Sequence, residues 1–257
     1  MPISVPLIQS RHNPHYKQWQ QYASHPERPE CPWIPIESNK QILELSRQQP
    51  IELLLFSNAS ETPAQELLPR SRQSQRLSAD LLQQISSLRS SQQMVAFFEK
   101  PVWEWEDLTP WVLYLDQLQD PGNLGTLLRT ARATNMFSVA TSPGSVACFN
   151  AKVIRASAAS LFAVPFREGL KLEELKSRGY ALRAATLQQG PSLFDARLES
   201  PLAIIIGNEG SGPTASTLAA IDDHLHIPMG EGSQSLNAAV AGSLIAYEIF
   251  RRGGNHG

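Results

Sequence analysis

Two polar, glycine-rich loops follow apolar segments in the C-terminal half of this 257-residue chain. The first belongs to IIIGNEGSGP, residues 204–213, and the second to HIPMGEGSQSLN, residues 226–237. The second loop runs straight into a helical pattern, so it leaves free backbone N–H and C=O groups beside a helix N-terminus. Such groups suit a small polar ligand, and ligands of open α/β sheets bind beyond the carboxyl ends of the strands.

The first loop differs from a phosphate-binding loop in two ways. Its glycines, Gly207, Gly210 and Gly212, read G-x-x-G-x-G, whereas a dinucleotide-binding loop reads G-x-G-x-x-G. Glu209 lies inside the loop, where its carboxylate would repel a pyrophosphate. A cationic or hydroxyl-bearing ligand therefore fits this loop better than the nucleotide of a Rossmann enzyme, which is kept as one alternative.

A third polar cluster, DQLQDPGNLGTLLRTAR, covers residues 116–132. We expect Asn123 to start and cap a helix there, because asparagine is a good N-cap. Arg129 and Arg132 are three residues apart and share the exposed face of that helix. Taken alone, the cluster also describes a capped surface helix whose arginines are only solvated.

Strand and helix patterns alternate around these clusters, which predicts an α/β fold. A mostly parallel sheet with helices on both faces follows from this alternation. In the last helix, whose candidate N-cap is Ser235, the positions expected to face the core are Leu236, Val240, Leu244, Ile245, Tyr247 and Ile249. We expect strands at 111–116, 136–141, 180–187, 202–207 and 224–229, and helices at 123–135, 150–161, 171–178 and 235–251.

A smaller α/β unit is predicted upstream, with strands at 51–57 and 94–99 and a helix at 77–92. The acidic and aromatic stretch WEWEDLTP, residues 103–110, separates two regions of different texture. We therefore predict an N-terminal domain over residues 1–102, a linker over 103–110 and a second domain over 111–257.

Composition excludes several classes of protein. Hydrophobic residues make up 42% and charged residues 18%, which supports a packed core. Two isolated cysteines have neither a disulfide pattern nor metal-ligand spacing, so we expect no metal. We expect a cytoplasmic protein that does not enter a membrane, because the chain shows no secretory signal and no apolar run near the ~18 residues of a membrane span.

Net charge is −2, but basic residues are grouped. Residues 121–167 hold no Asp or Glu, and they include Arg129, Arg132, Lys152 and Arg155. A second basic run is PRSRQSQR, residues 69–76. Local basic patches on a nearly neutral protein suit a defined phosphate-bearing partner, although ordinary solvated faces have the same composition.

In this order and spacing, the three clusters resemble the signature motifs of the SpoU-type, or TrmH-like, RNA ribose 2′-O-methyltransferases of the SPOUT superfamily. The resemblance spans about residues 111–252 and includes VIRASAASLFAVPF, residues 153–166. The first motif is N-x-G-x-x-x-R, here Asn123, Gly125 and Arg129. The second is G-x-E-G-x-G, here Gly207, Glu209, Gly210 and Gly212. The third is I-P-M followed by S-L-N, here Ile227, Pro228, Met229, Ser235, Leu236 and Asn237.

The resemblance implies a parallel sheet whose C-terminal segment forms a deep trefoil knot, working as a homodimer. The methyl donor would be S-adenosylmethionine and the substrate a structured RNA, with ribosomal RNA favoured over transfer RNA. The reaction would be methylation of a ribose 2′-hydroxyl. A knotted RNA-binding protein that has lost catalysis is the other alternative.

Roles for single residues follow from the same resemblance. Backbone at Gly207, Ile227 and Leu236 would hold the adenine and ribose of the cofactor, with Met229 and Thr186 as further contacts. Arg129 would contact the phosphate or the 2′-hydroxyl of the target nucleotide. The residues that would orient that hydroxyl and Arg129 are Asn123, Glu209, Ser235 and Asn237.

The N-terminal part resembles the substrate-binding domain of the family through S-x-x-N-P, here Ser10, Asn13 and Pro14. It departs from the family where an E-G pair is usual, because Glu37 is followed by Ser38. We expect RNA contacts from basic residues of both domains, namely Arg11, His12, Lys17, Arg70, Arg72, Arg76, Arg132 and Arg155.

Overall fold

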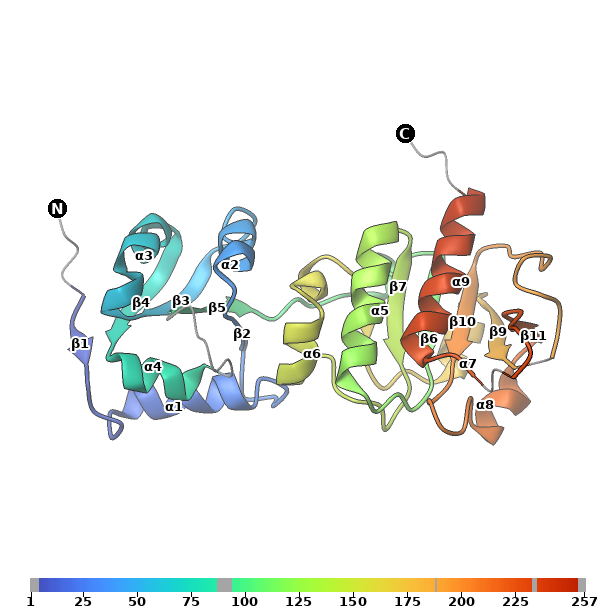
Figure 1. Cartoon of the computed structure of the whole chain (residues 1–257), viewed down its shortest axis with the longest axis horizontal. Coiled ribbons are helices and arrows are strands. Elements are labelled where there is room, and N and C mark those ends of the chain that lie inside the picture. Colours follow the sequence, from blue (N-terminus) through green and yellow to red (C-terminus); the bar gives the residue numbers. More distant parts are fainter. Residues whose placement is uncertain (1–4, 87–93, 188, 233–234, 254–257) are drawn as a thin grey trace. The chain divides into compact units, whose positions relative to one another are not determined.

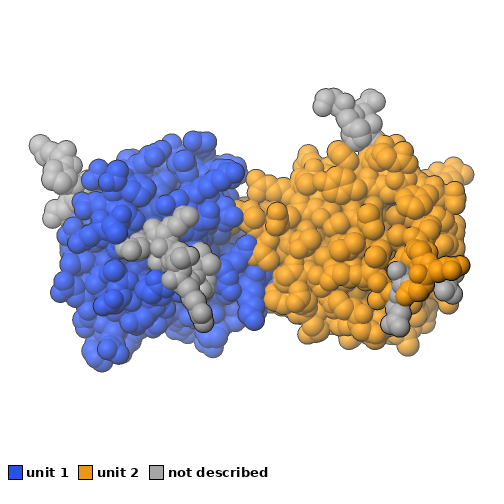
Figure 2. All heavy atoms as spheres, in the orientation of Figure 1, with its two compact units in different colours: residues 1–101, 149–155 blue, residues 102–148, 156–257 orange. Residues whose placement is uncertain are grey.

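A computed structural model describes residues 5–86, 94–187, 189–232 and 235–253. The chain divides into two compact units (Figure 2). Unit 1 is Met1–Pro101 together with Phe149–Arg155, and unit 2 is Val102–Cys148 together with Ala156–Gly257. Each unit is an α/β structure with its own sheet.

Unit 1 is built on a mixed five-stranded sheet of order β1-β4-β3-β5-β2. The β1–β4 and β4–β3 pairs are parallel, whereas β5 runs antiparallel to both β3 and β2. Its elements are β1 (Leu7–Ile8), α1 (Pro14–Ser24), β2 (Trp33–Ile36), α2 (Asn39–Leu45), β3 (Ile51–Phe56), η1 (Asn58–Ser60), α3 (Glu61–Leu67), η2 (Leu68–Arg70), β4 (Ser71–Leu77), α4 (Ala79–Ile85) and β5 (Met94–Glu99).

Helices cover both faces of this sheet, α1 and α4 on one side and α2 and α3 on the other (Figure 1). The α1–α4 side encloses a core in which Tyr16 and Trp19 of α1 meet Leu81 and Leu82 of α4. Helix α1 begins at Pro14 because the Asn13 side chain accepts hydrogen bonds from the backbone N–H groups of the first turn.

Unit 2 is built on a six-stranded, entirely parallel sheet of order β11-β9-β10-β6-β7-β8. From residue 102 onward the elements are η3 (Trp105–Asp107), β6 (Trp111–Leu115), α5 (Pro121–Thr134), β7 (Phe137–Thr141), α6 (Ala151–Ala156), η4 (Ser160–Phe162), β8 (Phe166–Arg167), α7 (Leu172–Lys176), β9 (Ala181–Thr186), β10 (Leu202–Ile206), α8 (Ala215–Ala220), β11 (Asp223–His226) and α9 (Ala238–Gly253). The predicted parallel α/β sheet is confirmed.

The central strands of unit 2 are buried on both faces, which explains their continuous apolar sequences. Val112 and Tyr114 of β6 pack into a core with Leu172 and Leu175 of α7. The opposite face is covered by α5 and α9, which lie side by side (Figure 1). Close contact there needs a small residue, because a Cβ at Gly242 of α9 would lie 2.6 Å from Leu127 Cδ2 of α5.

Several predicted elements differ from the structure. The helix expected at 150–161 is α6 followed by the 3₁₀ turn η4, and the helix expected at 77–92 is described only as α4. Part of that prediction, residues 87–93, lies outside the described residues. Prediction missed β1, β4, β8, α2, α3 and α8 as elements. The threading of the C-terminal segment into a knot stays a prediction.

The face assigned to the last helix was partly wrong. Ile245 and Ile249 are buried as expected, but Val240, Leu244 and Tyr247 are 47%, 46% and 50% exposed. Spacing alone did not separate two apolar stripes on one helix. The small residues Ala238, Ala239, Gly242 and Ala246 take part in the buried face, so the larger side chains lie on the other.

Candidate active site

The strand order of unit 2 places its three polar loops at one edge of the sheet. The chain passes from β6 outward through β7 to β8, and then crosses to β9, β10 and β11 on the other side of β6. This reversal lies between β6 and β10, and ligands of open α/β sheets bind beyond the carboxyl ends of strands at such a reversal. Two loops begin at this point of the sheet: residues 116–120 follow β6, and residues 207–214 follow β10.

The loop after β10 is a tight turn that only glycine permits at its start. Asn208 and Gly212 exchange both backbone hydrogen bonds, at 3.2 and 2.9 Å. A Cβ at Gly207 would lie 2.1 Å from the Gly212 carbonyl carbon and 2.1 Å from Pro213 N. Gly212 itself has a φ of +68°. The turn is therefore folded back on itself, and it carries Glu209 at its tip.

Residues after β6 hold this turn in place. Asp116, which is 3% exposed, accepts a hydrogen bond from Thr214 N–H at 2.7 Å through Oδ2. The Gln117 carbonyl accepts one from Asn208 Nδ2 at 3.0 Å. Neither Asp116 nor Gln117 was predicted as a site residue. A usable signal was their position, because they are the first polar residues after the buried run WVLYL.

Three predicted catalytic residues from three separate segments form one hydrogen-bonded chain. Asn123 of α5 donates from Nδ2 to Oε1 of Glu209. Asn237 donates from Nδ2 to Oδ1 of Asn123 at 3.0 Å. The side-chain oxygen Oδ1 of Asn237 also accepts from the backbone N–H groups of Ala239 and Val240, at 2.9 and 3.2 Å, so the network is fixed to the first turn of α9.

Two predicted helix caps were wrong, and both corrections concern this network. Helix α5 starts at Pro121, with Asp120 as its cap: Asp120 Oδ1 accepts from Asn123 N–H at 2.8 Å. Helix α9 starts at Ala238 and is capped by Asn237, two residues after the expected Ser235. The Asn123 side chain is therefore free of capping and reaches Glu209.

A pocket of about 750 Å³ opens beside this network. It lies at the carboxyl ends of β9 and β10 and is closed by the start of α9. All five predicted cofactor-binding residues line it: Thr186, Gly207, Ile227, Met229 and Leu236. Two of the predicted catalytic residues, Glu209 and Ser235, line it as well. Asn123, Arg129 and Asn237 are not among its described lining residues.

The chemistry of the pocket fits S-adenosylmethionine. Apolar walls from Ile206, Leu218 and Ile227 suit an adenine ring, and backbone groups of residues 207–212 suit its polar edge. The donor also carries a sulfonium and an α-amino group, both cationic. Glu209 is the charged residue of the described lining, and no Lys or Arg is found among those residues, so the cations meet no repulsion.

Arg129 is exposed on α5, and the structure does not bring it into the Asn123 network. It lies six positions after Asn123, which is about 9 Å along the helix axis. Among the described residues it has no hydrogen-bond or ion-pair partner. Arg132, one turn further on, is exposed as well. Both guanidinium groups are thus available to a molecule outside this chain.

The predicted RNA-binding residues of unit 1 lie in different settings. Arg11 and Lys17 are exposed, before α1 and on α1. Arg70 donates to Ser46 Oγ at 3.3 Å. Arg72 forms an ion pair with Glu52 at 3.4 Å, and the Nε of Arg76 is buried without a partner among the described residues. The run PRSRQSQR is therefore largely strand β4, which pairs with β1 and β3 in the sheet.

Comparison with known proteins gives a consistent result. Residues 110–247 match the family model described as the SpoU rRNA Methylase family. The protein named 23S rRNA (guanosine(2553)-2′-O)-methyltransferase RlmP, from Bacillus subtilis (strain 168), is 30% identical over 247 residues, which are 94% of this chain and 98% of that protein. A putative TrmH family tRNA/rRNA methyltransferase of Staphylococcus haemolyticus (strain JCSC1435) is 36% identical over 145 residues, 55% of this chain and 58% of that protein.

Solved structures agree. A crystal structure of an RNA 2′-O ribose methyltransferase has a TM-score of 0.79 at 26% identity and covers 96% of this chain and 99% of its own. The crystal structure of the SpoU methyltransferase AviRb from Streptomyces viridochromogenes, in complex with AdoMet, has a TM-score of 0.82 at 24% identity. It covers 93% of this chain and 98% of its own. The second likeness shows a shared fold. Together with the family match over residues 110–247, these results confirm the resemblance carried by the three motifs: the chain belongs to the SpoU rRNA methylase family.

Proposed function

We propose that this protein transfers the methyl group of S-adenosylmethionine to a ribose 2′-hydroxyl of ribosomal RNA. The observation that carries the proposal is the Glu209–Asn123–Asn237 network standing at the edge of a pocket that suits the methyl donor. Support for ribosomal RNA comes from the Bacillus subtilis relative, which is named as a 23S rRNA methyltransferase and aligns over nearly the whole of both chains.

When bound, S-adenosylmethionine supplies an electrophilic methyl group. The 2′-oxygen of the ribose would form a bond to the methyl carbon while the carbon–sulfur bond breaks with its electron pair left on sulfur. The hydroxyl proton would pass to a base, a role that we give to Oε2 of Glu209. Backbone groups at Gly207, Ile227 and Leu236 hold the donor, with Thr186 and Met229 beside them. Positioning the two reacting atoms in line can contribute up to ~7–11 kcal/mol to the rate of such a reaction.

The network sets the direction of the Glu209 carboxylate. Asn123 occupies Oε1 of Glu209, and Oε2 has no partner among the described residues. That oxygen can accept the hydrogen of the target hydroxyl or a hydrogen bond from Arg129. Asn237 fixes which end of the Asn123 amide faces Glu209, since it occupies the carbonyl oxygen. Ser235 lines the pocket beside the same network.

Arg129 aligns the target nucleotide and stabilises the developing alkoxide. A guanidinium keeps its proton in proteins and makes a poor general base. Its planar set of donors matches a phosphate or an oxyanion, which is the charge that forms in the transition state. The exposure of Arg129 suits contact with a large substrate approaching from outside the chain.

A second copy of this chain covers the exposed stripe of α9. Val240, Leu244 and Tyr247 are three large apolar side chains on one helix face, and Phe194, 59% exposed, lines an apolar pocket of about 420 Å³ together with the last two. Contiguous exposed apolar surface of this kind marks a contact with another macromolecule. The homodimer, the C-terminal knot, and the roles of residues 1–102 in RNA binding and 103–110 as linker belong to the same proposal.

The test is a titration of S-adenosylmethionine into the purified protein by calorimetry, followed by transfer of tritiated methyl to ribosomal and transfer RNA. Alkali-resistant label in ribosomal RNA is the expected result, and label in transfer RNA alone would move the substrate assignment. Arg129→Ala should lose methyl transfer while donor affinity stays within about twofold. Activity that survives this substitution would remove Arg129 from the mechanism. Absence of donor binding by the wild type would overturn the proposal itself.

A further inference from the structure

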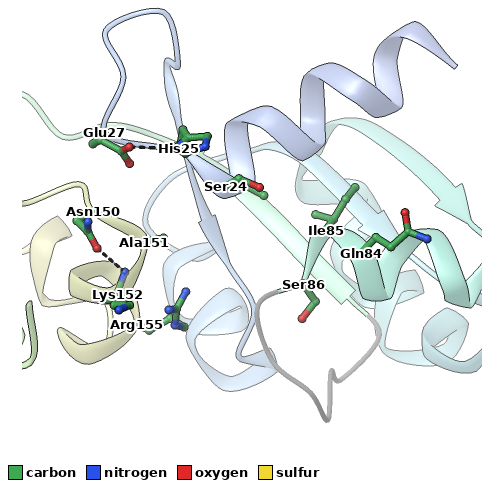
Figure 3. Close-up of a pocket in the computed structure, with 11 residues that line it drawn as sticks. Ser24, His25, Glu27, Gln84, Ile85, Ser86, Asn150, Ala151, Lys152 and Arg155 are labelled. Carbon is green, nitrogen blue, oxygen red and sulfur yellow. Dashed lines mark hydrogen bonds and ion pairs between the residues drawn. The ribbon is translucent and has the colours of Figure 1, made fainter. Parts of the chain in front are cut away.

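Unit 1 contains a second polar pocket, of about 440 Å³, that shares no residue with the pocket at Gly207. Three elements of unit 1 surround it: the end of α1, the end of α4 and the start of α6 (Figure 3). The polar and charged lining includes His25, Glu27, Gln84, Asn150, Lys152 and Arg155. Arg155 was expected to contact RNA, and the proposed methyl transfer assigns no role to the other residues of this lining.

The pocket has an excess of positive charge. Lys152 and Arg155 are three residues apart on α6, so their side chains share one face of the helix. Figure 3 shows both residues on one side of the pocket, with Ile85 and Ser86 on the other. Glu27 is the acidic residue of the described lining, and it lies 3.2 Å from Nδ1 of His25. The ammonium group of Lys152 has no partner among the described residues.

Local contacts fix the start of α6 and the residue before its cap. Asn150 caps the helix: its Oδ1 accepts from Lys152 N–H at 2.9 Å and its carbonyl from Ile154 N–H at 3.0 Å. Lys100, at the end of the β5 segment, lies 5.0 Å from the ring centroid of Phe149. The two cations of the pocket are therefore carried by a positioned segment of chain.

Beside the cations, the pocket offers both apolar and hydrogen-bonding surface. Ala23, Ile85 and Ala151 provide apolar wall, and Gln84 provides an amide at the other end of the cavity from α6 (Figure 3). Ser86 also lines it, with its hydroxyl donating to Glu37. A volume of about 440 Å³ lies within the ~300–1,000 Å³ of small-molecule pockets and accommodates one nucleotide.

We propose that this pocket binds one unpaired nucleotide of the RNA substrate, with its phosphate against Lys152 and Arg155 and its base toward Gln84 and Ile85. This inference rests on the proposed function, because it takes the substrate to be RNA. Proteins that recognise RNA by sequence target unpaired nucleotides, whose bases can leave the stack. Lys and Arg contacts to phosphates supply much of the affinity for nucleic acids and make it dependent on salt.

Lys152→Gln tests the proposal, since Lys152 is exposed and its loss should not affect folding. Binding of protein-free ribosomal RNA is measured by filter retention at several salt concentrations. We expect affinity about three- to tenfold lower near 0.15 M salt and a salt slope lower by about one, as for one lost phosphate contact. Lys152→Arg should restore both, and Lys152→Gln/Arg155→Gln should lose more than either single change.

Two controls make the outcome specific. Lys40→Gln removes an exposed lysine of unit 1 that lies outside the pocket, so it should leave binding unchanged. Glu27→Gln removes the negative charge of the pocket and should bind RNA no more weakly than the wild type. The proposal is overturned if Lys152→Gln behaves like Lys40→Gln, or if Glu27→Gln weakens binding.

The same measurements separate this inference from the proposed function. Failure of the proposed function means that the wild type transfers no methyl group to either RNA pool. Failure of the pocket proposal means that the wild type methylates RNA while the Lys152 variants bind that RNA with unchanged affinity and salt slope. In the supporting case, Lys152→Gln raises the KM for RNA, leaves kcat within about twofold, and keeps the affinity for S-adenosylmethionine.

Discussion

Units 1 and 2 are both α/β structures, yet they hold their functional side chains in different ways. In unit 2, Asn123, Glu209 and Asn237 come from three segments and bind one another, so each is fixed by the others. In unit 1, exposed cations such as Lys17 and Lys152 have no partner for their charge among the described residues. The first arrangement suits chemistry that needs fixed geometry, and the second suits attraction to a polyanion.

The comparison predicts two kinds of response to mutation. Changes within the unit 2 site should act strongly, because one displaced group disturbs its partners. Changes to the cations of unit 1 should act in small, salt-dependent steps, because each phosphate contact adds its own share.

Gly207→Ala should have the largest effect. Its Cβ would lie 2.1 Å from backbone atoms of Gly212 and Pro213, which cannot move without opening the turn. Overpacking of this kind typically costs about 1–3 kcal/mol, and we expect the upper end of that range here because the clash is with backbone atoms of the pocket wall, so S-adenosylmethionine affinity should drop by more than about 10²-fold. Gly210→Ala is the matched control, because its Cβ has only Asn208 Oδ1 nearby, at 3.8 Å. Calorimetric titration of both variants decides; equal affinities would show that the turn is not rigid.

Asn123→Ala should come next. It removes the donor to Glu209 and the acceptor for Asn237 in one step, while the helix keeps its Asp120 cap. We expect kcat for methyl transfer to fall by about 10²-fold, as when a positioned polar group of an active site is lost. Donor affinity should change little, since Asn123 does not line the described pocket. Thr126→Ala, on the same helix, breaks only a local bond to Gly122 and should keep activity.

Single strands show how much of the fold could be predicted from the sequence. The strands β6 and β10 were predicted within a residue or two because burial on both faces demands continuous apolar runs. Strand β4 was missed since its polar sequence SRQSQRL shows no apolar alternation, although it pairs with β1 on one side and β3 on the other. Backbone pairing supports such a strand regardless of its side chains.

The site was predicted through its motifs, and its supporting bonds were not. Thr186, Gly207, Ile227, Met229 and Leu236 do converge on one pocket. That Asp116 bonds to Thr214, 98 residues later, depends on the neighbouring places of β6 and β10 in the sheet. The spacing of residues along the chain holds no information about such a pair until the strand order is known.

Stability should depend on pH through Glu248 of α9. Hydrogen bonds from Arg251 and then Arg252 lower the pKa of this buried carboxyl to about 2, from an ordinary value of 4.5. Its contribution is therefore fully present above about pH 4.5 and is lost as pH falls toward 2. Because Arg251 is largely exposed, we expect only about 1–2 kcal/mol.

Glu248→Gln measures this contribution. Urea unfolding at pH 7 should give a free energy of unfolding about 1–2 kcal/mol below that of the wild type, and the gap should close toward pH 2. Arg252 also donates to the carbonyls of Ala196 and Leu193, at 2.5 and 2.7 Å, so the loop at 193–196 should loosen with the variant. A gap that stays constant with pH would show that the charge of Glu248 is not what stabilises α9.

The smallest effect is expected at Lys17, where the comparison of the two units is tested most directly. Lys17 is exposed on α1, and Lys17→Gln removes one charge without disturbing a partner among the described residues. We expect less than about threefold weaker binding of ribosomal RNA and a salt slope lower by about one at most, with Lys17→Arg as the charge-preserving control. Loss of methyl transfer at saturating RNA would contradict this division between the units. It would mean that Lys17 holds the substrate in a fixed geometry, and that it is not simply one of several cations that attract RNA. A graded loss that salt abolishes would instead confirm that unit 1 contributes attraction and unit 2 contributes geometry.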